Sequence, residues 1–275
     1  MTTAASRRPA RLAAVAALLA AAGLLTSTAL TPPAEAASAS ATEASFAKVQ
    51  ARLNGPAGVV VFRVGAAEDE KPLIQVGSFT TGVAWSTSKV PVTVAALARS
   101  SSSRTRSRAK AAITTSDNVA AKQLRESLGS ASKADARIQA VLRAAGDHRT
   151  VVGTRKTPPG LTPWRLDDQA RFAAGLACLP QGKVTVQLMG RVIPEQRFGL
   201  GRLTGSAIKG GWGPVGNGYL TRRLAIITMA DGTQFGVSVA VRTVQGFDRG
   251  KADLAKVADW LALQLAAREG GRCPD

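Results

Sequence analysis

Residues 84–99 read AWSTSKVPVTVAALAR and carry the clearest single indication of the fold. Ser86 and Lys89 are three residues apart, so one helical turn places both side chains on the same face. Pro91 to Arg99 predicts a helix that continues from this pair, and the proline is tolerable because it lies in the first turns. A serine hydroxyl becomes a nucleophile when a neighbouring base takes its proton, and a lysine of lowered pKa can do so. The stretch therefore predicts a serine and lysine pair at the head of a helix.

The segments that precede this pair predict a helix and a hairpin. Apolar residues share one helical face over Phe46–Leu53, and Asn54-Gly55-Pro56 ends the pattern. Gly58–Val64 and Leu73–Val76 are short apolar runs on either side of a charged turn. They predict two paired strands.

The segments that follow the pair predict a helical lobe, then strands, then a last helix. Helical patterns cover Val119–Leu128, Ser132–Ala145, Leu166–Leu179 and Val184–Val192. Strands are predicted at Ser206–Lys209, Tyr219–Met229 and Phe235–Arg242, and a helix at Lys251–Ala267. This order predicts an α+β fold, an antiparallel five-stranded sheet flanked by terminal helices with an inserted all-helical lobe. We expect one two-lobed domain over 37–275, with the helical lobe at about 86–200 and the sheet lobe at about 43–85 plus 201–275.

Two further motifs stand in this framework. Ser116-Asp117-Asn118 directly precedes a predicted helix, where all three residue types also cap helices well. Lys209-Gly210-Gly211 lies on the first strand after the helical lobe, where a glycine-rich strand end is the simpler interpretation. S-x-x-K, S-D-N and a lysine-glycine strand, in this order and context, resemble the signature of class A β-lactamases and penicillin-binding proteins. The resemblance covers nearly the whole chain after residue 36.

The resemblance implies a role for each motif residue. Ser86 would attack an amide or lactam carbonyl, Lys89 would accept its proton, Ser116 would relay that proton to the leaving nitrogen, and Asn118 would hold the substrate's amide side chain. Lys209 would lower the pKa of Lys89 and attract a substrate carboxylate, with Gly210 and Gly211 beside the substrate. The backbone N–H groups of Ser86 and Trp212 would form an oxyanion hole.

Three departures from the family pattern limit this interpretation. Gly210 lacks the hydroxyl that the family's K-T-G or K-S-G motif offers to a carboxylate. Ser116 follows Ser86 by only 30 residues, which predicts a trimmed lobe and an open cleft. The stretch Thr154–Asp168 contains no Glu to activate a deacylating water.

The charged residues of that last stretch are poor substitutes for the missing Glu. Arg155, Lys156 and Arg165 are protonated cations. Asp167 and Asp168 fall in the opening turn of a predicted helix, where acidic side chains favour the helix dipole. We therefore expect slow deacylation.

The N-terminal residues read as a secretory signal. Arg7, Arg8 and Arg11 precede an apolar run at Leu12–Leu25, and Ala34-Glu35-Ala36 fits a cleavage site, so residues 1–36 are interpreted as a signal peptide. The arginine pair leaves twin-arginine export open as an alternative. The apolar run is too short to span a bilayer, so we expect a secreted protein that is not an integral membrane protein.

The strong positive charge predicts anionic partners. Loss of residues 1–36 removes three Arg and one Glu, which takes the formal charge from +18 to +16. Cell-wall polymers or phospholipid headgroups are the expected partners, while few aromatics and no reading motif disfavour nucleic acid. The basic stretch Arg104–Lys110 is interpreted as a solvated loop, with a wall-docking patch as the alternative.

Cysteine and histidine counts exclude some chemistries. Cys178 and Cys273 are the only cysteines, and in an exported chain they predict a disulfide. With His148 as the sole histidine, in a polar turn, neither a conventional zinc site nor a Ser-His-Asp triad is expected. No cofactor is implied, and we expect a monomer.

The leading hypothesis is an exported serine hydrolase that forms an acyl-enzyme on Ser86 with β-lactam or D-alanyl-peptide-like substrates. The alternative is a catalytically weakened, wall-associated binding protein of the same fold, which the glycine at 210 favours. A third hypothesis, a basic adhesive protein with accidental motifs, requires three coincidences in order.

Overall fold

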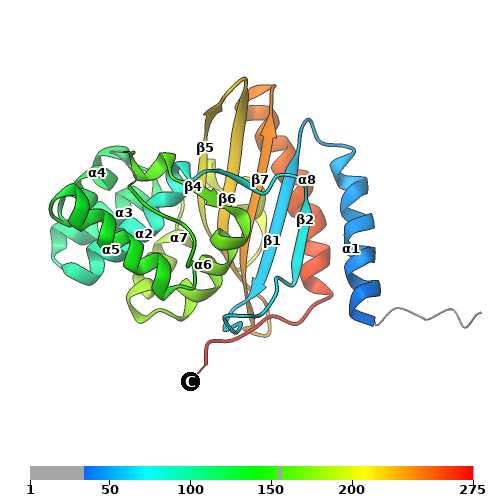
Figure 1. Ribbon diagram of the computed structural model, residues 1–275, viewed down its shortest axis with the longest axis horizontal. Helices are drawn as coiled ribbons and strands as arrows, with labels where there is room; N and C mark the ends of the chain where they lie inside the picture. Colours follow the sequence, from blue (N-terminus) through cyan, green and yellow to red (C-terminus); the bar gives the residue numbers. More distant parts are fainter. Residues whose placement is uncertain (1–33, 154–156, 275) are drawn as a thin grey trace, which may run out of the picture.

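An antiparallel five-stranded sheet forms the centre of the molecule (Figure 1). The computed structural model describes residues 34–153 and 157–274. The strand order is β2-β1-β7-β6-β5, so β5 lies at one edge. The strands are β1 (Ala57–Arg63), β2 (Ile74–Gly77), β5 (Ser206–Val215), β6 (Gly218–Thr228) and β7 (Gln234–Thr243). A separate two-stranded ribbon pairs β3 (Thr81–Val83) with β4 (Pro163–Arg165).

Helices cover both faces of the sheet (Figure 1). The two terminal helices α1 (Ala34–Gln50) and α8 (Gly246–Ala266) lie on one face, and α6 (Leu166–Cys178) packs against the other. Beyond α6 lies the helical lobe. It comprises α2 (Lys89–Arg99), α3 (Ser103–Thr114), α4 (Asn118–Glu126), α5 (Ala131–Ala144) and α7 (Lys183–Met189). The predicted α+β architecture is therefore confirmed.

Separate apolar clusters join these layers. Val59, Val61 and Val239 alternate inward along β1 and β7 toward Leu254 and Leu261 of α8. This alternation is typical of a sheet with a core on each face, because successive strand residues point to opposite sides. A second cluster fills the helical lobe and extends to β6; its large members include Ile113, Leu124, Ile138, Leu142, Trp164 and Phe172. The sheet and the helical lobe are thus each built on their own core and meet along β5 and β6.

Several sequence predictions were wrong. The first helix, predicted over Phe46–Leu53, is α1 and spans Ala34–Gln50. The basic stretch Arg104–Lys110, interpreted as a loop, belongs to the helix α3. Ser102 caps this helix by accepting a hydrogen bond from the Thr105 backbone N–H, and Thr105, Ala109 and Ile113 bury one face at helical spacing. The strand predicted at Ser206–Lys209 continues to Val215, because its glycine-rich half is paired residue by residue with β6.

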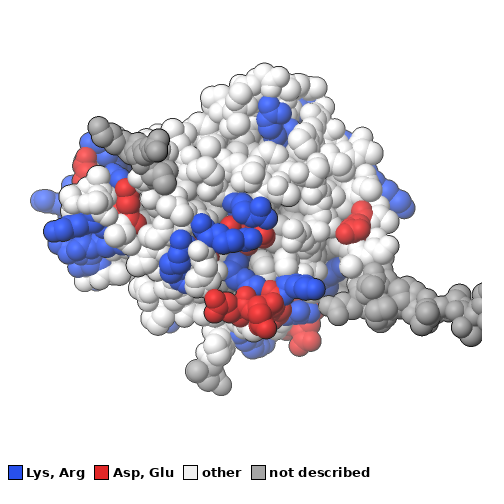
Figure 2. Space-filling model, in the orientation of Figure 1, with Lys and Arg blue, Asp and Glu red and all other residues white. Residues whose placement is uncertain are grey.

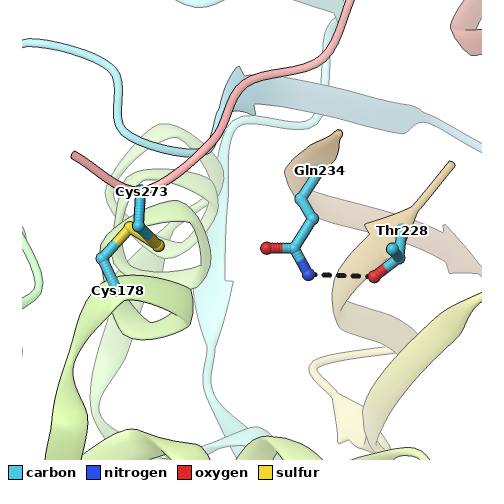
Figure 3. Close-up of a disulfide and its surroundings, with 4 residues drawn as sticks. All are labelled: Cys178, Thr228, Gln234 and Cys273. Carbon is cyan, nitrogen blue, oxygen red and sulfur yellow. Dashed lines mark hydrogen bonds between the residues drawn. A yellow bond between two sulfur atoms is a disulfide. The ribbon is translucent and has the colours of Figure 1, made fainter. Parts of the chain in front are cut away.

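Cys178 and Cys273 form the predicted disulfide (Figure 3). It joins the last residue of α6 to the C-terminal tail, and the Cα atoms are 5.3 Å apart, within the usual range for disulfides. The tail also pairs with β7 through Gly271 and Gln234, whose side chain donates to Thr228 (Figure 3). The C-terminal tail is therefore held against both the sheet and α6.

Replacement of both cysteines by serine should lower the free energy of unfolding by up to about 4.7 kcal/mol, because the bridge closes a loop with a sequence separation of 95. Urea denaturation of the variant and the parent measures the difference. Neither cysteine lines the cavity described below, so covalent labelling of Ser86 should be unchanged. Two free thiols in the unreduced parent protein would contradict the assignment.

The predicted signal peptide falls mostly on residues 1–33, outside the described residues, and its last three positions lie at the start of α1. Within 34–153 and 157–274, no helix combines the length and the apolar character needed to cross a bilayer. Figure 2 shows Lys and Arg at the outer end of the helical lobe and also over the middle and lower part of this face, where acidic side chains lie beside them.

Candidate active site

The predicted nucleophile lies where the helical lobe meets the edge of the sheet. Trp85–Ser88 form a short 3-10 turn, η1, that runs directly into α2. Trp85 has a φ of 47°, which a bulky side chain rarely adopts. Such backbone strain persists only where the surrounding structure enforces it. Here it places Ser86 at the junction, half-buried, facing β5.

Gly211 of β5 allows this close approach. A Cβ at this position would lie 2.8 Å from the Ala84 carbonyl oxygen and 3.0 Å from the Ser86 nitrogen. Any side chain would therefore push η1 away from the strand. Since β5 is an edge strand, it meets η1 along a side that no other strand occupies. The predicted oxyanion-hole groups, the N–H of Ser86 and that of Trp212, come from these two neighbouring segments.

Lys89 lies at the centre of the site and contacts the first two motifs. Its Nζ is 2.9 Å from Ser86 Oγ, 3.1 Å from Ser116 Oγ and 2.6 Å from Asn118 Oδ1. It also donates to the Ser116 carbonyl oxygen at 2.6 Å. Burial lowers the pKa of Lys89 to about 8, although the nearby Asp117 carboxylate opposes the shift. A substantial neutral fraction near pH 8 makes this amine a competent proton acceptor.

The S-D-N motif both caps a helix and contacts Lys89. Asp117 is the N-cap of α4 and accepts a hydrogen bond from the Ala120 N–H at 2.8 Å. Ser116 has a φ of 62°, a second strained non-glycine residue beside Lys89. Its carbonyl and hydroxyl oxygens both face the lysine. The cap thus holds Ser116 and Asn118 in the positions from which they contact the Lys89 amine.

Lys209 of β5 completes a chain of alternating hydroxyl and amine groups. It is fully buried, and its Nζ donates to Ser116 Oγ at 2.9 Å and to the Gly210 carbonyl at 2.9 Å. Burial, together with the positive charges of Lys89 and Arg223, lowers the pKa of Lys209 well below its ordinary value. Ser86, Lys89, Ser116 and Lys209 are therefore linked by successive contacts of 2.9, 3.1 and 2.9 Å.

Arg223 is a residue of this region that the sequence did not single out. It pairs with Gly210 across β5 and β6, is fully buried, and lies 3.5 Å over the Phe198 ring. Its Nε donates to the Phe198 carbonyl, while Nη1 and Nη2 are buried with no partner among the described residues. Burial lowers its pKa to about 9. The only hint in the sequence is Arg222-Arg223 within an otherwise apolar strand.

The guanidinium of Arg223 explains the glycine at position 210. A Cβ there would lie 1.5 Å from Nη1 of Arg223, so a Thr or Ser side chain and this arginine exclude each other. Its two Nη groups have no partner in the described part of the chain, and Arg223 is not among the residues that line the cavity described below.

We predict that Gly210→Thr destabilises the protein by about 1–3 kcal/mol through overpacking. A different conformation of Arg223 would be energetically costly, because its side chain is fully buried against Phe198. Combining Gly210→Thr with Arg223→Ser should cost less than the sum of the two single changes. Urea denaturation of the four proteins of this cycle measures the coupling. Additive losses would show that the two side chains do not compete for one space.

A cavity of about 1040 Å³ opens onto Ser86. This volume is close to the upper limit for small-molecule sites. Its wall includes members of the first two motifs together with Trp85 and Trp212. Asp135 supplies the one carboxylate among the described lining residues, and Arg125 binds it at 2.6 Å. Sequence reasoning missed this pair because both lie in ordinary helical patterns.

Asp167 and Asp168 take the structural role that the sequence predicted. Both lie in the first turn of α6 and outside the cavity wall. Asp167 accepts hydrogen bonds from Arg149 and Arg165. Burial disfavours the ionised form of Asp167, but these bonds outweigh it and lower its pKa. The predicted cations Arg155 and Lys156 fall in 154–156, outside the described residues. His148 is half-exposed, 3.2 Å from Glu68, and is not among the residues that line the cavity.

No cluster of three or more metal-ligating His, Cys, Asp or Glu side chains occurs within the described ranges.

The architecture is shared with solved β-lactamases. The TLA-3 extended-spectrum β-lactamase superposes with a TM-score of 0.66 at 14% identity, over 82% of this chain and 99% of that one. A class A β-lactamase from Bacteroides cellulosilyticus gives 0.65 at 11% identity, covering 82% and 99%. A β-lactamase from Burkholderia vietnamiensis gives 0.64 at 17%, covering 84% and 98%. A scan of protein-family models and a search of curated proteins find no match. The chain thus has the fold of the class A β-lactamases.

Proposed function

We propose that this protein is an exported active-site-serine hydrolase. It forms an acyl-enzyme on Ser86 with β-lactam or D-alanyl-peptide-like substrates and releases the acyl group slowly. The observation that carries the proposal is the 2.9 Å contact between Ser86 Oγ and the Nζ of Lys89, whose pKa is about 8. A serine beside an amine that is partly neutral at physiological pH has the activation that nucleophilic catalysis needs.

Acylation follows from the chain of contacts. Neutral Lys89 takes the Ser86 hydroxyl proton as the Oγ–carbon bond forms, and the carbonyl oxygen becomes an oxyanion. The N–H groups of Ser86 and Trp212 would stabilise that charge. As the carbon–nitrogen bond breaks, Ser116 gives its proton to the leaving nitrogen and regains one from Lys89. Ser116 Oγ is 3.1 Å from Lys89 Nζ, so this transfer needs no rearrangement.

The cations around Gly210 support recognition of an anionic substrate. Lys209 and Arg223 flank this residue, and Arg223 has two buried N–H groups with no partner in 34–153 or 157–274. A buried donor without a partner is costly. Arg223 is fully buried and is not part of the described cavity wall, so a substrate carboxylate could bond to these donors only after a local rearrangement. β-Lactams and D-alanyl peptides both carry such a carboxylate. The positive charge beside Gly210 would therefore attract the substrate carboxylate, without any side chain replacing the missing hydroxyl.

Deacylation lacks an evident base. A positioned base contributes roughly 10²- to 10⁴-fold to such a step. Asp135, the carboxylate of the described cavity wall, is held in an ion pair with Arg125 at 2.6 Å. Asp167 and Asp168 lie outside that wall. The acyl-enzyme should therefore accumulate.

We predict that benzylpenicillin forms a stoichiometric adduct that persists for minutes or longer, with weak bulk hydrolysis. Stopped-flow acylation followed by intact-protein mass spectrometry over time measures both steps. Asp135→Asn is the matched control and should leave the lifetime of the adduct unchanged. Free enzyme regenerating within seconds, slowed in the Asp135→Asn variant, would identify Asp135 as a base and overturn the prediction. Absence of any adduct would favour the alternative of a binding protein of this fold.

A further inference from the structure

The stretch from Lys71 to Ser116 contains no acidic residue, and its cations concentrate on one helix. Arg104, Arg106, Arg108 and Lys110 all lie on α3, three of them exposed and Arg108 partly exposed. Arg99, also exposed, ends the preceding helix α2. None of these five side chains forms an ion pair with a described residue.

Helix stability does not explain this composition. Arg104 and Arg108, like Arg106 and Lys110, are four residues apart, a spacing at which like charges repel. The first turn of α3 has no acidic residue, although the helix dipole favours one there. The helix is held instead by its Ser102 cap and by the buried face of Thr105, Ala109 and Ile113. The exposed cations are therefore available to an external anion.

We propose that this basic face of α3, formed by Arg104, Arg106, Arg108 and Lys110, docks a linear phosphodiester polymer such as a poly(glycerol phosphate) chain. The two rows of cations flank the exposed side of a helix about 18 Å long, and neighbours within a row are about 6 Å apart along its axis. A flexible chain with one charge per repeat can follow this helix and pair with both rows. Its binding energy comes mainly from release of counterions.

The surface chemistry distinguishes a polymer from a membrane. The exposed residues of α3 are Ser103, Arg104, Arg106, Ser107 and Lys110, so no apolar side chain of this helix is exposed for insertion between lipids. Interfacial helices combine a basic face with exposed Trp, Phe or Leu. Binding of single-stranded nucleic acid likewise relies on aromatic stacking, and α3 has no aromatic residue. A flexible polyanion that binds through charge alone fits a helix with exposed cations, no exposed apolar side chain and no aromatic residue.

The position of α3 connects such docking to the candidate active site. The helix ends at Thr114, and the next two residues, Thr115 and Ser116, line the cavity. A polymer bound along α3 would therefore keep the cavity at Ser86 close to whatever is attached to that polymer. This docking does not depend on turnover at Ser86.

The test compares two full-length mature variants that lose the same charge. The first carries Arg104→Gln, Arg106→Gln, Arg108→Gln and Lys110→Gln. The control carries Lys48→Gln, Arg52→Gln, Lys71→Gln and Arg249→Gln, four exposed cations outside α3 and without ion pairs among the described residues. Affinity for poly(glycerol phosphate) is measured over a range of salt concentrations. Phosphatidylglycerol vesicles, which present the same headgroup chemistry, and a single-stranded oligonucleotide are measured in parallel.

The α3 variant should lose on the order of tenfold or more in affinity, and its slope of log affinity against log salt should fall by roughly 2 to 3. The control should stay within a few-fold of the parent, and thermal melting should show both variants folded. Equal losses of affinity in the two variants would show that binding depends only on the net charge of the protein and would overturn the proposal. Tighter binding of the parent protein to the vesicles or the oligonucleotide than to the polymer would also overturn it.

Discussion

Ser86→Ala is expected to abolish covalent labelling by β-lactams while the protein stays folded. The change removes only the Oγ that would form the acyl bond. Ser116 Oγ cannot replace it without movement, because it is held by Lys89 and Lys209. The expected mass of the treated variant is that of the unmodified chain.

The measurement is intact mass after incubation with excess benzylpenicillin, together with thermal unfolding of the variant. Ser88→Ala is a matched control, since Ser88 also lines the cavity but donates to the Trp85 carbonyl at 2.8 Å and forms no hydrogen bond with the Lys89 amine. It should label as the parent does. Labelling of Ser86→Ala at the parent rate would refute the assignment of the nucleophile.

Lys89→Met is expected to slow acylation by roughly 10²- to 10⁴-fold, the usual contribution of a positioned base. Methionine keeps the length of the apolar stem and removes the amine. The neutral form of Lys89 is the reactive one, and its pKa is about 8. In the parent protein the acylation rate should therefore rise tenfold per pH unit below about pH 8 and level off above it. This rise should be absent in the variant.

Stopped-flow acylation rates of both proteins between pH 6 and pH 10 separate a base from a structural role. If Lys89 only held Ser116 and Asn118 in place, its replacement by methionine would lower the acylation rate by the same factor at every pH. A parent rate that falls as pH rises through 8 would show that the ammonium form is required and would contradict the proposed mechanism.

Local patterns were sufficient to predict most of the fold. β-Branched runs, helical spacing and turn residues gave the strands and helices around the sheet, because these signals lie within a few residues of one another. The failures have local causes too. The surface of α3 is so basic that its buried positions, Thr105, Ala109 and Ile113, form only a narrow apolar stripe. The half of β5 after Lys209 is rich in glycine, and its strand character comes from pairing with β6.

The candidate site was predictable to the extent that its chemistry lies in motifs. Ser86, Lys89, Ser116, Asn118 and Lys209 are brought together by the structure, with contacts among them of 2.6 to 3.1 Å. Arg223 and Asp135 belong to no motif. The first reaches the site only because β6 pairs with β5, and the second because α5 forms part of the cavity wall. The sequence alone does not show the steric conflict between Arg223 and a side chain at position 210, or the backbone strain at Trp85.

The most direct test of the central claim is to locate the acyl group. The mature protein is incubated with benzylpenicillin, digested, and its peptides are sequenced by tandem mass spectrometry. We predict one equivalent of penicilloyl group, attached to Ser86 and to no other residue. An adduct on a different side chain, or an unmodified Ser86 after exposure to β-lactam and D-alanyl ester probes alike, would contradict the account.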